Sequence, residues 1–206
     1  LEDETFNAAG AKLIVHGRNV HPGSAKGKMV NSILIAQEFQ TLLPVFPNPM
    51  YTEGREGFFH LDGISGNVEE TTAEYIIRDH DKTLFEQKKE LFRACADFLN
   101  RKYGEGTVTV EMADSYYNMK EVLTPHAHLM ENACRALREL GVEPKITPVR
   151  GGTDGSRLSY MGLPCPNLCT GGAAYHSRLE YACVRSMETV TELLIKLAVC
   201  YKNADI

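Results

Sequence analysis

Residues 82–103 read KTLFEQKKELFRACADFLNRKY and carry the strongest structural signal in the sequence. Their apolar side chains recur every three to four residues, as on one face of a helix, and Gly104 follows as a typical helix end. We therefore predict an amphipathic helix over Lys82–Tyr103. Its apolar face must be covered by a sheet or by another helix.

The segments on either side of this helix supply a sheet. Alternating apolar and polar residues predict two antiparallel strands before it, and a β-branched strand follows it. Before this helix we expect a strand (Lys12–His16), a helix (Gly27–Leu43) and two strands (Phe58–Ile64 and Ala73–Arg78). After it we expect one further strand (Thr107–Met112). This order is that of a ferredoxin-like βαββαβ sandwich, in which both helices cover one face of a four-stranded antiparallel sheet. We expect it over residues 1–118.

The rest of the chain, residues 119–206, alternates helix and strand signals. We expect helices over His126–Leu140, Thr153–Met161 and Ser186–Tyr201, and strands over Lys145–Val149 and Pro166–Thr170. This pattern favours part of an α/β domain, so the chain as a whole falls in the α/β class. Two or three strands make too small a sheet to be covered on both faces, so this segment is expected to need further chain to pack against.

Composition limits the expected partners and location. The 206 residues carry a net charge of −5 with scattered basic residues, so no positive stripe is offered to nucleic acid. No apolar run reaches the roughly 18–20 residues that span a bilayer, and the opening of the chain lacks the pattern of a secretory signal. We expect a cytoplasmic protein without membrane or nucleic-acid partners, whose six cysteines are reduced and mostly buried.

Glycines and polar residues are concentrated late in the chain. The run contains Arg150-Gly151-Gly152-Thr153-Asp154-Gly155, then Thr170-Gly171-Gly172, and finally His176 with Glu180. Such a composition is poor material for a core but suits loops that bring backbone and polar side chains to a ligand. We therefore predict half of an active site here.

Five motifs in this order carry a family resemblance. They are Asn19–Asn31, Ile77–Asp79, Ser115–Met119, Arg150–Gly155 and Leu163–Gly172. Together they resemble the tripeptide aminopeptidases of the M20 family of two-zinc metallopeptidases. The resemblance implies a ferredoxin-like lid or dimerisation domain, residues 1–118, and a returning segment of the zinc-binding catalytic domain, residues 119–206. It extends only to the C-terminal portion of such an enzyme, so the catalytic glutamate and most zinc ligands would lie outside this chain.

The resemblance assigns His176 to the last metal ligand. A neutral imidazole is a suitable zinc donor, and a loop that follows two glycines can aim it. The alternative is a partly buried histidine that caps a strand. Glu180 is expected to support the site rather than bind the metal, and Asp154 to hold its own loop or to steer Arg150 or His176.

His21 lies in a loop rich in glycine and proline. In the resembling enzymes, the lid histidine of this motif donates a hydrogen bond to the oxygen that becomes negative when water attacks the peptide carbonyl. His21 is therefore the expected oxyanion donor. The alternative is a turn histidine without a catalytic role.

Three further residues are candidates for binding substrate: Arg78, Asn118 and Arg150. A guanidinium matches a carboxylate geometrically, so the two arginines are expected to grip the free carboxylate of a peptide. The glycines beside Arg150 leave room for a ligand, whereas Arg78 ends a strand and could simply pair with Asp79 or Asp81. Asn118 would be a polar substrate contact or a strand-end cap.

Other metal-like patterns are rejected. His60-Leu61-Asp62 spells a His-x-Asp motif and Glu69-Glu70 resembles a catalytic carboxylate pair, but strand alternation explains both as solvent-facing residues. Cys165 and Cys169 with His176 would make a structural zinc site, but the surrounding prolines and apolar residues favour buried strand thiols.

We therefore predict a metallo-exopeptidase that removes the N-terminal residue from tripeptides with a zinc-activated water. One ligand cannot hold a catalytic zinc, so the chain alone is expected to be inactive. The alternatives are a dipeptidase or an N-acyl amino acid amidohydrolase of the same superfamily, or a non-catalytic dimerisation or binding module. Expected partners are the tripeptide and the missing N-terminal half, with a homodimer through the lid left open.

Overall fold

A computed structural model describes residues 1–202 of the chain. The chain forms two compact units, which are taken here one at a time. Residues 6–118 form the first, called the sheet unit, and residues 1–5 together with the chain from Met119 onward form the second, called the helical unit. Leu1–Thr5, which the sequence analysis groups with the sheet, therefore belongs to the helical unit.

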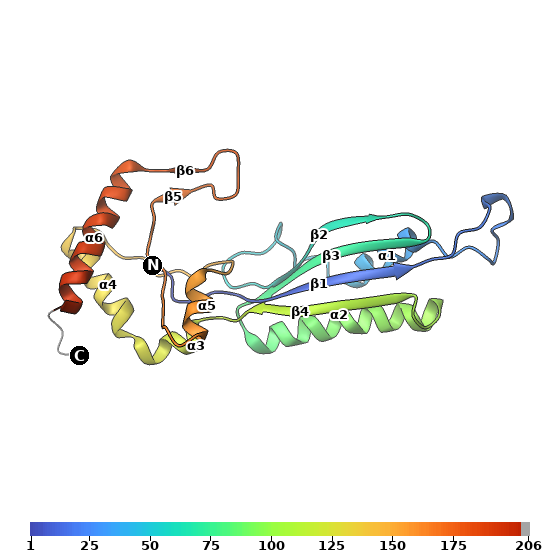
Figure 1. The fold of residues 1–206 in the computed structure, drawn as a ribbon, viewed down its shortest axis with the longest axis horizontal. Coiled ribbons are helices and arrows are strands. Elements are labelled where there is room, and N and C mark those ends of the chain that lie inside the picture. The colour runs from blue at the N-terminus through green and yellow to red at the C-terminus, as the bar shows by residue number, and fades with distance from the viewer. Residues whose placement is uncertain (203–206) are drawn as a thin grey trace. The chain divides into compact units, whose positions relative to one another are not determined.

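The sheet unit is built on four antiparallel strands in the order β2-β3-β1-β4 (Figure 1). The strands are β1 (Asn7–His16), β2 (Phe58–Gly66), β3 (Glu70–Asp79) and β4 (Val108–Tyr116). With its two helices this is the predicted βαββαβ arrangement, and the mixed α/β fold class is confirmed. Each strand is longer than predicted, because polar residues on one face do not interrupt the backbone ladder.

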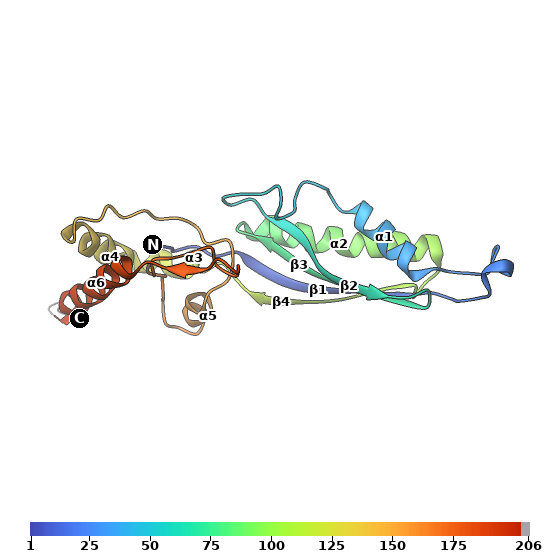
Figure 2. The same ribbon diagram turned by 90° about the horizontal axis from the view of Figure 1, so that it is seen from above.

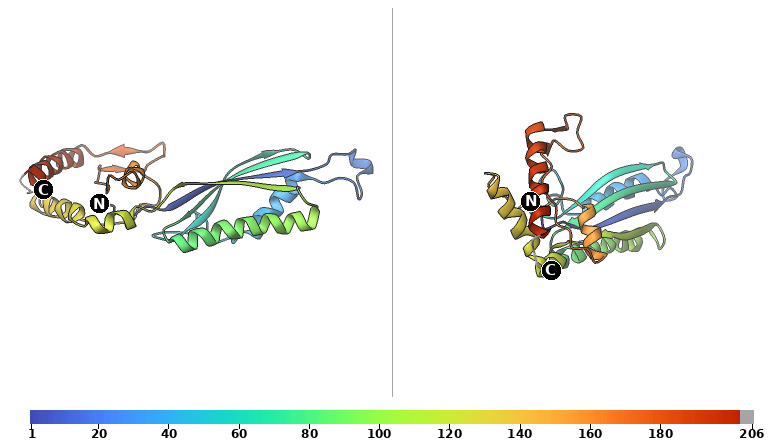
Figure 3. Two further views of the ribbon diagram at one scale, coloured as in Figure 1. Left: turned by 60° about the horizontal axis from the view of Figure 1, so that its bottom comes forward. Right: turned by 60° about the vertical axis from the view of Figure 1, so that its left-hand side comes forward.

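Helices α1 (Ser32–Leu42) and α2 (Lys82–Tyr103) cover one face of this sheet, and no helix of the sheet unit lies on the other (Figure 2). Helix α2, green in Figure 3, has the predicted bounds. Helix α1 begins later than the predicted Gly27, because Asn31 caps its first turn with Oδ1, which accepts the N–H of Ile33 at 3.0 Å.

Aromatic rings hold both helices to the sheet. The Phe92 ring of α2 lies 4.7 Å from the Phe39 ring of α1 and 5.0 Å from the Tyr75 ring of β3, centroid to centroid. All three residues are buried, and edge-to-face pairs of this kind contribute about 0.5–1.5 kcal/mol each beyond their burial. The helix face of the sheet is therefore filled, and a ligand can reach only the uncovered face and the strand ends.

The helical unit consists of helices of 4 to 19 residues and one small hairpin, joined by loops. Its elements are α3 (Lys120–Leu123), a 3-10 turn (Thr124–His126), α4 (His128–Glu139), α5 (Asp154–Tyr160), the hairpin of β5 (Gly172–Ala173) and β6 (Tyr181–Ala182), and α6 (Val184–Lys202). The three helices predicted in this region are present with shifted ends. Helix α3 and the hairpin were not predicted.

The two strands predicted in the helical unit are wrong. Lys145–Val149 and Pro166–Thr170 are irregular segments that flank the N-terminal end of the chain. The backbone N–H groups of Thr147 and Val149 donate to the carbonyls of Leu1 and Glu4 at 3.0 and 2.9 Å. Asn167 and Glu2 exchange two backbone hydrogen bonds, at 2.8 and 3.0 Å, as one isolated bridge. Too few such bonds form in succession to build a strand ladder.

The core of the helical unit is small. It consists of Leu1, Ala133, Cys134, Ala136, Leu137 and Leu193. In α6 only Leu193 is buried, while Leu194, Ile195 and Val199 are 52%, 61% and 53% exposed. Neither α6 nor any other helix in the described range combines the length and the hydropathy needed to cross a bilayer. The apolar side of α6 is a surface that a further protein segment could cover.

The cysteines are free thiols, and fewer are buried than predicted. Cys95 and Cys134 are buried, whereas Cys169 and Cys183 are exposed and Cys165 is intermediate. These three were predicted to be buried, but they lie in loops around α5 and the hairpin rather than in covered strands, and Cys200 of α6 is also only partly buried.

Candidate active site

His21 precedes a 3-10 turn, Pro22–Ser24, in the loop that follows β1. The residue is exposed, and its Nδ1 accepts the N–H of Gly23 at 3.1 Å. A neutral imidazole whose Nδ1 accepts a hydrogen bond carries its proton on Nε2. The turn therefore presents His21 as a hydrogen-bond donor through Nε2, which is the state that an oxyanion donor requires.

Arg78 lies near the end of β3, on the face without helices. Its Cζ is 5.1 Å from the centroid of the Tyr116 ring, and its buried Nη1 has no hydrogen-bond partner within residues 1–202. Asp79, which the sequence analysis offered as a partner, instead binds Nζ of Lys88 at 2.6 Å. Burial lowers the pKa of Arg78, which stays charged at neutral pH.

Asn118 ties the end of the sheet together. Its backbone N–H donates to Oδ1 of Asn7 at 3.0 Å, and its Nδ2 donates to the carbonyl of His80 at 3.1 Å. These bonds give Asn118 the strand-end role that the sequence analysis weighed against substrate binding. A substrate contact by Asn118 stays a prediction.

His21 and Arg78 lie at opposite ends of the sheet. Arg78 pairs with Ala8 at the start of β1, whereas the chain reaches His21 only after His16 at the other end of that strand. At about 3.3 Å per residue, the stretch from Ala8 to His16 alone spans roughly 26 Å. Figure 1 shows the blue loop after β1 beyond one end of the sheet, far from the end at which β3 finishes. Within one sheet unit, the two side chains cannot reach the same small ligand.

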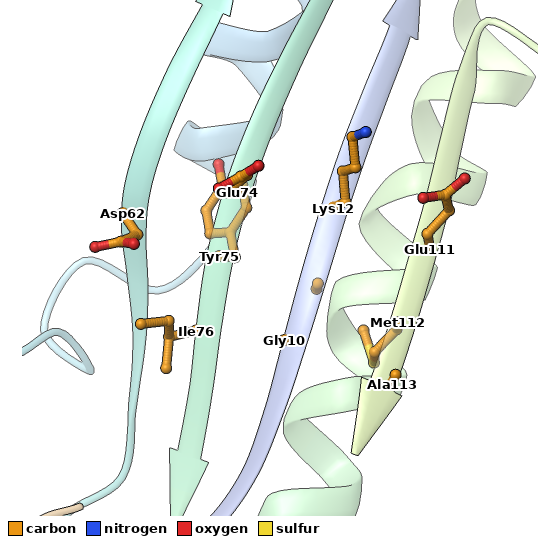
Figure 4. Close-up of a pocket in the computed structure, with 10 residues that line it drawn as sticks. Gly10, Lys12, Asp62, Glu74, Tyr75, Ile76, Glu111, Met112 and Ala113 are labelled. Atoms are coloured by element: carbon orange, nitrogen blue, oxygen red, sulfur yellow. The ribbon is translucent and has the colours of Figure 1, made fainter. Parts of the chain in front are cut away.

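A hollow on the uncovered face lies between these ends (Figure 4). Lys12 of β1 pairs across the strands with Glu74 of β3 and Glu111 of β4. Opposite charges directly across neighbouring strands stabilise a sheet, so these three side chains have a structural role without a ligand.

In the helical unit, the loop that starts at the partly buried Arg150 leads into α5. Oγ1 of Thr153 caps α5 by accepting the N–H of Ser156 at 3.4 Å. A Cβ at the buried Gly155 would collide with the carbonyl oxygen of Cys165. Glycine therefore allows α5 to pack directly against the backbone at Cys165. The hollow beside it measures about 810 Å³, and its lining includes Asp154, Asn167, Thr170, Gly171, Gly172 and Tyr175.

His176 lies in the loop of the β5–β6 hairpin, directly after Tyr175. The residue is exposed, and its φ of 63° is in the left-handed region, which residues other than glycine rarely adopt. Oε2 of Glu180 accepts the backbone N–H of His176 at 2.9 Å. Glu180 thus stabilises a strained loop conformation that leaves the imidazole accessible, as occurs at functional sites.

The described residues do not form a metal centre by themselves. Across residues 1–202, no three side chains of the His, Cys, Asp or Glu type are grouped so that they could hold a metal ion. Nε2 of His60 and Oδ1 of Asp62 lie 3.5 Å apart, but both side chains are exposed on β2. A metal-ligand role for His176 stays a prediction.

Sequence reasoning missed Tyr116, the ring beside Arg78. Alternation counted from Glu111 places Tyr116 on the helix face of β4, and an irregularity in the pairing of β4 with β1 reverses this. No local pattern in the sequence indicates that irregularity.

Residues 3–107, about half of the chain's length, match the family model described as the peptidase dimerisation domain of the M20 family. The chain belongs to this M20 family. Its M20 relatives include peptidase T of Alkaliphilus oremlandii, 57% identical over 203 residues, and peptidase T of Caldanaerobacter subterraneus, 54% identical over 201 residues. These alignments cover 98% of this chain but 50% and 49% of the relatives, so the chain spans about half the length of the relatives it matches.

Solved structures of two peptidases share the fold. The aminopeptidase PepT from Bacillus cereus is 21% identical with a TM-score of 0.76, and a tripeptidase from Staphylococcus aureus is 18% identical with a TM-score of 0.81. Each comparison covers 95% of this chain and 52% of the other. At this level of identity, the likeness establishes the fold and leaves the chemistry to be argued from the residues.

Proposed function

We propose that this M20 chain is part of a metallo-exopeptidase that removes the N-terminal residue from tripeptides. The observation that carries the proposal is the exposed His176, whose loop Glu180 stabilises. In a protein of the relatives' length, two zinc ions bound mainly by residues outside this chain would supply an activated water. Relatives named peptidase T support a peptidase, and the fold shared with a Staphylococcus aureus tripeptidase is consistent with tripeptides as the substrate.

The residues of this chain would bind and orient the peptide. Arg78 and Arg150 would grip its free carboxylate, because a guanidinium offers two parallel N–H donors to the two oxygens. His21 would donate from Nε2 to the carbonyl oxygen as it becomes negative. Removal of one such donor lowers kcat by about 10²-fold or more in other hydrolases.

The separation of His21 from Arg78 sets a condition on this function. Since roughly 26 Å of strand lies between their ends of the sheet, His21 of one copy must serve the peptide that Arg78 of another copy holds. A homodimer through the sheet unit would meet this condition, and the match of residues 3–107 to a dimerisation domain supports one.

Complementation between two inactive variants tests this arrangement. The assay protein is a chimera. It joins this chain to the half of the Alkaliphilus oremlandii relative that the chain does not match. In it, His21→Ala and Arg78→Ala are each expected to abolish tripeptide hydrolysis. A dimer of one variant with the other holds one intact site, so an equal mixture should regain about a quarter of wild-type activity. A mixture that forms such dimers and stays inactive would show that His21 does not act between copies.

Zinc content and tripeptide hydrolysis test the function itself. The chimera is expected to bind zinc and to cleave trialanine, whereas residues 1–206 alone should do neither. His176→Ala should lose zinc and activity together. His60→Ala is the matched control, because His60 is also a histidine with an exposed side chain, and it should keep both properties.

Other results of the same assay would select other functions. A chimera without zinc would rule out the enzyme and leave a non-catalytic dimerisation module, which the family match to residues 3–107 favours as the second candidate. A zinc-loaded chimera that prefers dipeptides or N-acyl amino acids would be a different member of the same superfamily.

A further inference from the structure

Four residues form a row across the uncovered face of the sheet unit. The register places Phe58 opposite Arg78, and it places Ala8 between Arg78 and Tyr116. Directly opposed residues in antiparallel strands project to the same face. Because Ala8 has only a methyl group, the Arg78 side chain can extend over it to the Tyr116 ring, where its Cζ lies 5.1 Å from the ring centroid.

A β-bulge turns Tyr116 into this row. Met112 and Asp114 of β4 face the helices, since Met112 packs against the core and Asp114 binds Nζ of Lys89 at 2.8 Å. Simple alternation would place Tyr116 on the same side. The register of β4 against β1 shifts by one residue at Ser115, and the shift directs Tyr116 to the uncovered face.

Arg78 is a partly buried cation without an acid beside it. Asp79 binds Lys88 at 2.6 Å, and Asp81 accepts the N–H of Leu84 at 2.9 Å as the cap of α2. Nη1 of Arg78 finds no acceptor in the part of the chain that the structure describes. A buried charge without a partner is destabilising, so an anion that supplies the missing acceptor would bind favourably.

Hydrogen bonding does not account for the position of the Tyr116 ring. The Tyr116 hydroxyl is buried and, like Nη1 of Arg78, has no partner among the described residues. Burial raises the pKa of Tyr116, and the nearby Arg78 opposes this rise. The ring is therefore a neutral phenol at physiological pH, and its π face attracts the guanidinium.

We propose that Tyr116 is a positioning residue that holds Arg78 ready to bind the C-terminal carboxylate of a peptide. The proposal rests on the proposed function for the choice of ligand. The ring fixes the guanidinium from one side, and Ala8 leaves the space that this geometry needs. Without the ring, the long arginine side chain would have to be ordered at the moment of binding, at a cost in entropy.

Arginine side-chain NMR of residues 1–206 tests the proposal. The Nε–Hε resonance of Arg78 is followed while trialanine, or trialanine amide as a probe without a carboxylate, is added. The wild-type resonance should shift in a saturable way with trialanine and not with the amide. Tyr116→Leu should weaken this binding about fivefold to thirtyfold, the range of a cation–π contact, and Tyr116→Phe should stay within about twofold of wild type.

Tyr103→Leu is the matched control. Nζ of Lys102 lies 4.9 Å from the centroid of the Tyr103 ring, so this change also removes a tyrosine beneath a cation, and carboxylate binding should not change. Equal shifts with the acid and the amide, or wild-type affinity in Tyr116→Leu, would overturn the proposal. If Tyr116→Leu does not fold, weakened binding by Tyr116→Phe would overturn it instead.

These outcomes are separable from the proposed function, because the measurement needs neither zinc nor catalysis. An active chimera in which Tyr116→Leu keeps the wild-type KM for tripeptides would refute only the role of Tyr116. Normal carboxylate binding by Arg78 in a chimera without zinc would refute only the peptidase.

Discussion

Replacement of Lys88 by methionine should destabilise the sheet unit far more than the same change at Lys102. Both lysines make ion pairs with an N–O distance of 2.6 Å, Lys88 with Asp79 and Lys102 with Glu38. The Lys88 and Asp79 side chains are 17% and 3% exposed, whereas those of Lys102 and Glu38 are 47% and 25% exposed. The two pairs differ in burial and not in distance, so the comparison isolates the effect of burial.

The magnitude follows from the charge that is left behind. Without Lys88, the buried Asp79 carboxylate keeps the backbone N–H of Asp81 as a donor, at 2.9 Å. Loss of one partner from a buried pair costs about 3–5 kcal/mol, and the lower value applies because water reaches Lys88. Methionine preserves the apolar stem, so the packing changes little. For a unit of this size, about 3 kcal/mol lowers the Tm by roughly 12 °C or more. The exposed pair should change the Tm by no more than about 3 °C.

Thermal unfolding of residues 1–206, followed by circular dichroism and checked by urea titration, measures both effects. A third protein, the double variant Lys88→Met with Asp79→Asn, removes the unpaired charge. It should recover a large part of the Tm that Lys88→Met loses. Equal falls in Tm for the two lysine variants would refute the reasoning that burial decides the outcome. So would a double variant no more stable than Lys88→Met.

Three further predictions concern the sheet unit. Gly17→Ala should destabilise it by about 2 kcal/mol or more in urea titration, because a Cβ there would collide with the carbonyl oxygen of Val68. Asp81→Ala should cost about 1 kcal/mol in the same assay, because the N–H of Leu84 loses its cap. Hydrogen bonds from Lys102 and Tyr103 lower the pKa of Glu38 below its ordinary 4.5. The ionised Glu38 side chain therefore stabilises the fold above pH 4.5, and this stabilisation is lost as the pH falls through the lowered pKa. The difference in Tm between wild type and Glu38→Gln should therefore shrink between pH 6 and roughly pH 3, and a constant difference would contradict this.

Much of the sheet unit could be predicted from the sequence because its elements carry local signals. Helix α2 begins and ends where its periodic pattern does, since Asp81 caps its start and Gly104 its end. The helical unit could be predicted less well. The segments of its two expected strands are hydrogen-bonded to residues 1–4, which are more than a hundred positions away in the sequence, and a local pattern cannot indicate that pairing.

For the candidate site, the sequence identified chemical groups but not their placement. His21 and Arg78 could be named from the residues around them, but their separation could not. It follows from the sheet register, because Arg78 of β3 pairs with the start of β1 and His21 follows the end of β1. Tyr116 faces Arg78 only because of a bulge in β4. The bond from His176 to Glu180 spans four residues, and the short spacing explains why a supporting role for this carboxylate could be expected from the sequence.

The two ends of the sheet unit are neighbours. Oδ1 of Asn7 accepts the backbone N–H of Asn118 at 3.0 Å. Thr5 and Met119 each lie one residue outside the unit, and Oγ1 of Thr5 accepts the N–H of Met119 at 3.2 Å. A segment whose entry and exit lie side by side can be excised and closed with a short linker, or exchanged for its counterpart from a relative, without rerouting the host chain. Residues 6–118 are thus a transplantable cassette, and an exchanged unit would carry His21 and Arg78 with it.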